Sequence, residues 1–133
     1  NDNTLLIIMI ESLAALEQVD EIAAVRGVDV LHIGSSDLSS DLGVPGEQTH
    51  PKVKAAFERI VAACHKHGKI LGMGGVYDQE NAARYVGMGA LFLLTGSDHS
   101  YMMAGADQRV TFFNGLPGPA PASAAGKKRK KGK

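Results

Sequence analysis

Residues 28–43 carry the sequence VDVLHIGSSDLSSDLG, in which a short apolar run leads into a polar, glycine-containing segment. The run at 28–33 is too short for a helix and rich in aliphatic residues, which is typical of a strand buried inside a parallel sheet. We expect the segment after it, Gly34-Ser35-Ser36-Asp37, to form a loop at the carboxyl end of that strand. Parallel α/β proteins bind their ligands at such strand ends.

The same alternation continues on both sides of this stretch. Apolar runs predict further strands at 5–10, 69–73 and 90–95, and helical spacing with start and stop residues predicts helices at 12–25, 51–67, 78–86 and, more weakly, 101–113. Strands separated by helices in this way indicate an α/β protein with a parallel sheet. Two architectures fit, a doubly wound open sheet or part of a (β/α)8 barrel, and a whole barrel needs about 250 residues.

Composition sets the broad class of protein. The chain has 133 residues, of which 44% are hydrophobic and 21% charged, which fits one globular domain. No apolar run is long enough to span a bilayer, so we expect no membrane partner. The single cysteine, Cys64, excludes an internal disulfide framework and is compatible with a reducing compartment, and we therefore expect a cytoplasmic protein.

The formal net charge of zero conceals two different parts. Six of the 14 Lys and Arg residues lie within 127–133, behind a segment rich in Pro, Ala and Gly. We therefore expect a partial barrel domain at 1–115, with an acidic balance, and a disordered linker and basic tail at 116–133. The tail is expected to be a solvated terminus. A nuclear address or contact with a phosphate backbone is the alternative, without sequence-specific recognition of nucleic acid.

Two carboxylates fall at neighbouring strand ends. Glu11 directly follows the first expected strand, and Asp37 lies four residues beyond the second. Such a pair suits a hard divalent cation such as Mg²⁺ or Mn²⁺, which takes its remaining ligands from water and substrate. Alternatively, Glu11 interacts with the dipole of the next helix and Asp37 forms an Asx turn. The spacing alone leaves both interpretations open.

Several motifs together resemble one known family. They are Ile10-Glu11-Ser12, the segment 25–29 (VRGVD), the segment 33–43 (IGSSDLSSDLG) and the segment 84–90 (RYVGMGA). Over about residues 6–100 the chain closely resembles the HpcH/HpaI aldolases, which are metal-dependent, pyruvate-utilising class II aldolases. The resemblance implies a TIM barrel of the phosphoenolpyruvate/pyruvate type, of which this chain supplies the C-terminal half, strands five to eight.

The resemblance also implies roles for particular residues. Glu11 and Asp37 would be the ligands of a divalent metal, which would be Mg²⁺, Mn²⁺ or, as a third option, Co²⁺. Backbone amides of Gly34, Ser35 and Ser36 would hold the carboxylate of pyruvate or its enolate. Family members commonly have proline where Ser35 stands, so we expect a less rigid loop here. Gly74 lies where a strand meets this rim, and its small size leaves room for substrate. A glycine-rich turn without a ligand is the alternative for Gly74.

The catalytic histidine and the substrate-binding arginine of this family lie in the first half of the barrel, which no segment of this chain matches. We do not assign His50 or His99 in their place, because a rim or surface histidine is more often structural or solvated. His32 lies inside an expected strand, where its ring should be packed, and we assign it no role.

The leading interpretation is a divalent-metal-dependent carbon–carbon lyase that acts on 2-keto acids through a pyruvate enolate and is incomplete as this chain. The alternative is a catalytically silent half-barrel that serves as an assembly or interaction module. A citrate-lyase-like activity is a third, less favoured, option. Half a barrel leaves open sheet edges, so we expect a homo-oligomer or association with a missing N-terminal half.

Overall fold

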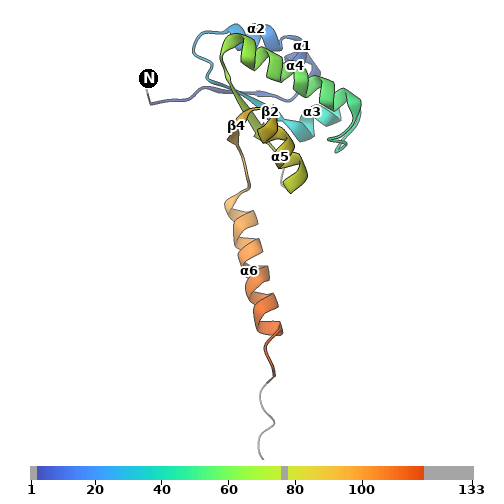
Figure 1. Cartoon of the computed structure of the whole chain (residues 1–133), viewed down its shortest axis with the longest axis vertical. Coiled ribbons are helices and arrows are strands. Elements are labelled where there is room, and N and C mark those ends of the chain that lie inside the picture. The colour runs from blue at the N-terminus through green and yellow to red at the C-terminus, as the bar shows by residue number, and fades with distance from the viewer. Residues whose placement is uncertain (1–2, 76–77, 119–133) are drawn as a thin grey trace, which may run out of the picture. The chain divides into compact units, whose positions relative to one another are not determined.

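The computed structural model describes residues 3–75 and 78–118. The chain divides into two compact units, Asn1–Gly96 and Ser97–Lys133, and each is described by itself. The first unit contains a four-stranded sheet (Figure 1), whose strands are β1 (Ile7–Ile10), β2 (Val30–Gly34), β3 (Ile70–Gly74) and β4 (Ala90–Leu93). All of its strand pairs are parallel.

The order of the strands decides between the two predicted architectures. Each strand pairs with the strand that precedes it in the chain, so that the order is β1-β2-β3-β4. A doubly wound sheet reverses its strand order at a switch point, whereas the strands of a (β/α)8 barrel follow one another around the axis. Within the described residues the sheet therefore has the barrel order, and the predicted parallel α/β arrangement is confirmed.

The described residues of this unit form five helices, and two of them begin or end at predicted start and stop residues. The helices are α1 (Leu13–Glu17), α2 (Val19–Ala24), α3 (Ser35–Asp41), α4 (Pro51–His67) and α5 (Gln79–Gly87). The Asp78 side chain caps α5 by accepting a hydrogen bond from the Asn81 backbone N at 2.9 Å. Pro51 is the first residue of α4, and Gly68, with a φ of 62°, ends that helix in the left-handed conformation that glycine adopts readily.

Two predictions about the helices are wrong. The single helix expected at 12–25 is two helices, because the backbone leaves the helical path at Gln18. The Arg59 side chain of α4 donates a hydrogen bond to the Glu17 carbonyl at 2.7 Å, which satisfies a carbonyl at this break. No loop forms from Gly34 to Asp37, because Gly34 is the last residue of β2 and α3 begins at Ser35.

Serines made this segment look like a loop, because they often compete with the helical backbone for hydrogen bonds. Here the hydroxyls of Ser39 and Ser40 both donate to the Ser36 carbonyl, at 2.8 and 3.0 Å, within the helix itself. Leu38 is fully buried in the core. Local bonding and tertiary packing together outweigh the weak helix propensity of the serines.

The two faces of the sheet differ in what covers them. On the covered face, side chains of the strands pack with α4 and α5 in one hydrophobic core that includes Ile10, Leu31, Ile33, Leu71, Phe57, Ile60 and Tyr85. Helix α2 packs beside α4 (Figure 1). Strand residues alternate between faces, so the intervening residues form the open face, where register aligns Met9, His32, Gly72 and Phe92.

The second unit contains α6 (Asp98–Asn114), which confirms the weaker helix predicted at 101–113 and extends it. Ser97 and Ser100 form a capping box at its start, and none of its residues is buried. The disorder expected at 116–133 concerns mainly residues 119–133, which lie outside the described residues, so it stays a prediction. In the part of the chain that is described, no helix is long and apolar enough to cross a membrane.

Candidate functional site at the carboxyl ends of the strands

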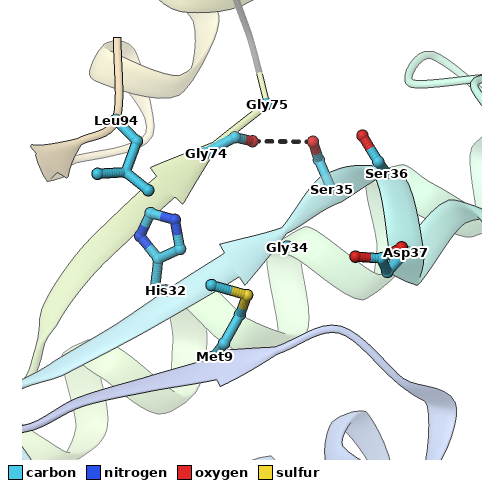
Figure 2. A pocket seen from close by; sticks show the side chains of 9 residues that line it. All are labelled: Met9, His32, Gly34, Ser35, Ser36, Asp37, Gly74, Gly75 and Leu94. Carbon is cyan, nitrogen blue, oxygen red and sulfur yellow. Dashed lines mark hydrogen bonds between the residues drawn. The ribbon is translucent and has the colours of Figure 1, made fainter. Parts of the chain in front are cut away.

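An open pocket of about 180 Å³ lies at the carboxyl ends of β2 and β3 (Figure 2). The residues around it come from all four strands or the segments that follow them, and the first turn of α3 contributes its polar wall. The lining residues are Met9, His32, Gly34, Ser35, Ser36, Asp37, Gly74, Gly75 and Leu94. The structure therefore brings together Asp37, Gly34, Ser35, Ser36 and Gly74, which were chosen from sequence.

A buried hydrogen bond fixes the polar wall of the pocket. The Ser35 hydroxyl donates to the Gly74 carbonyl at 2.9 Å, and the bond joins the start of α3 to the end of β3 (Figure 2). The Gln48 side-chain amide also donates to the Ser35 carbonyl, at 3.4 Å. The serine hydroxyl thus supplies a link between two elements that a proline at this position cannot make.

The two candidate metal ligands have different places, since Asp37 is among the residues that line the pocket and Glu11 is not. Asp37 is in the first turn of α3 and lines the pocket. Glu11 follows β1 and comes close to Gly34, because a Cβ atom added to Gly34 would lie 2.8 Å from Glu11 Cβ and 3.2 Å from Glu11 Oε2. Glycine is therefore needed at position 34 for the Glu11 side chain to occupy this place.

The donor set fits an open cation site and not a closed one. Among the described residues, no group of three or more His, Cys, Asp and Glu side chains is placed to hold a metal ion. Two carboxylates are nevertheless the set that a cation such as Mg²⁺ uses when water and substrate complete its shell. Glu11 and Asp37 fit that partial shell.

His32 is a pocket residue that sequence reasoning missed. Its ring is packed, as predicted, with 1% of the residue exposed and an edge-to-face contact to Phe92 at 5.7 Å between ring centroids. Burial lowers the pKa of its imidazole. Its position two residues before Gly34, on the same face of the strand, is the signal that could have placed it in the pocket.

The glycines of β3 make room for this imidazole. A Cβ atom on Gly72 would lie 2.7 Å from His32 Nδ1, and one on Gly74 would lie 2.6 Å from His32 Nε2. Both separations are shorter than any ordinary contact, so a larger residue at either position would displace the ring. The space beside Gly74, which the sequence analysis predicted to be available for substrate, therefore adjoins His32.

The other two histidines considered from sequence have different places. His50 caps α4, and its Nδ1 accepts a hydrogen bond from the Lys52 backbone N at 3.2 Å. His99 lies in α6, in the second unit. Neither lines the pocket described above.

A singly wound parallel sheet with a pocket at its carboxyl ends defines the class of the chain as a (β/α)8-type α/β protein, of which the described residues contain four strands. Residues 1–104 match the HpcH/HpaI aldolase/citrate lyase family, and the chain belongs to that family. The resemblance found in the sequence motifs is thus confirmed.

Relatives and solved structures agree with this assignment. The 4-hydroxy-4-methyl-2-oxoglutarate aldolase tasA of Hapsidospora irregularis is 40% identical over 102 residues, which are 75% of this chain and 38% of the relative. The 4-hydroxy-2-oxo-heptane-1,7-dioate aldolase of Escherichia coli is 35% identical over 113 residues, covering 85% and 43%.

The crystal structure of the HpcH/HpaI aldolase from Desulfitobacterium hafniense DCB-2 superposes with a TM-score of 0.74 at 33% identity, over 90% of this chain and 46% of that one. The chain thus spans less than half the length of these relatives.

Proposed function

We propose that this chain provides the metal-binding and keto-acid-binding half of a class II aldolase, a carbon–carbon lyase that acts on 2-keto acids of the pyruvate type. The observation that carries the proposal is the pocket at the strand ends, which places Gly34, Ser36 and Asp37 of the family motif around one cavity. Family membership supports the reaction class.

Each candidate residue has a distinct task in this proposal. Glu11 and Asp37 hold the divalent cation, which is Mg²⁺, Mn²⁺ or Co²⁺. A cation at that place supplies positive charge for the oxygen anion that develops as the carbon–carbon bond breaks. Backbone amides of Gly34, Ser35 and Ser36 orient the substrate carboxylate.

Two further features support this division of tasks. Gly34 has no side chain that could cap the first-turn amides of α3, which leaves them available for a carboxylate. The Ser35–Gly74 hydrogen bond holds Gly74 as the opposite wall.

The chain alone is proposed to be incomplete for turnover. Among the nine residues that line the pocket, none is an arginine, and the base and arginine of the family belong to the other half of the barrel. The open face supports the same conclusion, because Ile7 is 38% exposed and Met9 is 46% exposed. We propose that the N-terminal half of a barrel of this family or a second copy of the chain covers this face. A silent assembly module, which the same open face favours, is the second candidate.

Cation binding tests the site itself. We expect Mn²⁺ to bind weakly to the full chain in a calorimetric titration, and Asp37→Asn to weaken that binding more than tenfold, because it removes a charged ligand. Asp107→Asn is the matched control, since it makes the same chemical change on α6. Equal Mn²⁺ affinity in the chain and in Asp37→Asn would contradict the assignment.

Complementation tests the reaction. We expect no retro-aldol turnover of a 4-hydroxy-2-keto acid by the chain alone with Mg²⁺ or Mn²⁺. Co-expression with the amino-terminal half of the Escherichia coli relative should produce turnover that Glu11→Ala abolishes. Turnover by the isolated chain would refute its incompleteness. An assembled but inactive complex would favour the silent module.

A further inference from the structure

His32 places a buried imidazole in the pocket, and the proposed function assigns no role to it. It projects from β2 between the side chains of Met9 and Leu94 (Figure 2). It lies two residues before Gly34 on the same face of the strand, so it stands deeper in the pocket than the rim residues. Apart from this ring, the deep part of the pocket is formed by apolar side chains and glycines.

Packing alone does not explain why this ring is a histidine. Its Nδ1 atom is buried and has no hydrogen-bond partner in the described structure. An unpaired buried polar atom destabilises a fold, and an apolar ring would fill the same space without that penalty. The neighbouring Phe92 shows that this face of the sheet accommodates such a ring.

Two neighbouring residues are adapted to the imidazole. Gly72 lies in the interior of β3, where glycine weakens a strand, and Gly74 is the last residue of that strand. A Cβ atom on either would lie within 2.7 Å of a ring nitrogen of His32. The sheet therefore has glycine at the two positions where any larger side chain would displace this ring.

The surroundings of the ring also indicate which nitrogen carries the proton. Burial lowers the pKa of His32, so the neutral ring has one donor and one acceptor nitrogen. Nδ1 lies on the side of Gly72 and has no acceptor there, and an unpaired buried N–H is rarer than an unpaired acceptor. We therefore assign the proton to Nε2, which lies beside the pocket residue Gly74.

We propose that the Nε2–H of His32 donates a hydrogen bond to an oxygen atom of a 2-keto acid bound in this pocket, and that His32 is a specificity-determining residue for this ligand class. The inference rests on the proposed keto-acid site.

Imidazole NMR of the uniformly ¹⁵N-labelled full chain tests the contact directly. The spectrum of His32→Gln assigns the ring signals of His32 by their disappearance. We expect the Nε2–H tautomer in the free chain. On addition of Mg²⁺ and pyruvate, the ring signals of His32 should shift together with the backbone amides of Gly34, Ser35 and Ser36.

Three substitutions separate hydrogen bonding from packing. A glutamine amide nitrogen reaches the place of Nε2, an asparagine amide reaches that of Nδ1, and phenylalanine supplies neither donor. We expect His32→Asn and His32→Phe to bind pyruvate about tenfold more weakly than the chain, and His32→Gln to stay within about threefold. A merely structural histidine would not distinguish the two amides. Backbone amide spectra establish that each variant is folded.

The outcomes separate this inference from the proposed function. If pyruvate shifts the amides of Gly34, Ser35 and Ser36 but leaves the ring of His32 unchanged, the keto-acid site stands and the role of His32 is refuted. If pyruvate shifts neither set, both proposals fail. Undiminished pyruvate binding by a folded His32→Phe also refutes the role of His32, whatever the spectrum of the unsubstituted chain shows.

Discussion

The two faces of the sheet are formed by alternate residues of the same strands. Helices cover one face, and the other face is open. On the covered face, Ile10, Leu31 and Ile33 are fully buried against helices that the chain itself supplies. On the open face, the neighbouring residues Ile7 and Met9 are more than a third exposed, while His32 is buried by its own strand neighbours. Stability therefore resides on the covered face, whereas the chemistry of the pocket belongs to the open face and its rim.

This difference explains how a chain that spans less than half the length of its relatives contains a complete hydrophobic core. Helix α4 follows β2 in sequence and packs on β2 and β3, and α5 follows β3 and packs on β4. Residues of α1, α2 and α3 complete the same core, so segments of this chain cover this face. The open face has no such local source of cover among the described residues. Substitutions on the two faces should differ accordingly.

The largest expected effect comes from the covered face. Phe57→Ala removes a fully buried ring that packs against Tyr85, and should lower the free energy of unfolding by about 3–5 kcal/mol. Met9→Ala on the open face should lower it by less than about 1 kcal/mol, because its side chain is partly in water already. Urea denaturation of both variants measures the contrast. Similar losses would mean that the open face is covered in solution.

A smaller loss of stability is expected from a substitution in the lining of the pocket. Gly74→Ala places a methyl group 2.6 Å from His32 Nε2 and should destabilise the chain by about 1–3 kcal/mol. Gly87→Ala is the control, since nothing lies within 4 Å of its added Cβ atom and its helix tolerates alanine.

The double variant Gly74→Ala/His32→Ala should recover part of the stability lost in Gly74→Ala, because the clash is absent. A loss that persists unchanged in the double variant would show that His32 is not what confines position 74. Thermal denaturation of the unsubstituted chain, Gly74→Ala, His32→Ala and the double variant provides the cycle.

The smallest expected change in stability comes from an exposed ion pair between helices α2 and α4. Asp20 of α2 accepts from Lys66 at 2.7 Å and contacts His67 of α4 at 3.0 Å, and these bonds lower its pKa below the usual 3.8. The unfolded chain therefore binds the proton first, and the stabilisation is present above about pH 5 and is lost as the pH falls below 3.8.

Melting temperatures of the chain and of Asp20→Asn should accordingly differ most at neutral pH and converge in acid. The difference should also shrink in 1 M salt, because both partners are exposed. A difference that stays constant from pH 7 to pH 3 would contradict this account.

Local chemistry made much of the fold predictable. Pro51, Gly68 and Asp78 determine the ends of α4 and the start of α5 through backbone geometry and capping, which depend on a few adjacent residues. The break at Gln18 was not predictable, because it involves Arg59, more than forty residues away in sequence. Helix α3 was missed because the hydrogen bonds of its serines are visible only in three dimensions.

The candidate site shows the same limit. Asp37 and Gly34 could be placed at a rim from strand alternation and motif alone, and the structure places both at the pocket. The position of His32 in the pocket also follows from the alternation of strand residues. Which residues of β3 lie beside its ring depends on the register between β2 and β3. Only the pairing of His32 with Gly72 and of Gly34 with Gly74 shows that the glycines of β3 surround the ring.

The strictly sequential strand order has a consequence for how the chain is made. Each strand pairs with the one synthesised just before it, so a nascent chain leaving the ribosome always finds the template for its next strand already in place. Domains generally form from the amino terminus during synthesis, and this strand order is compatible with pairing one strand at a time.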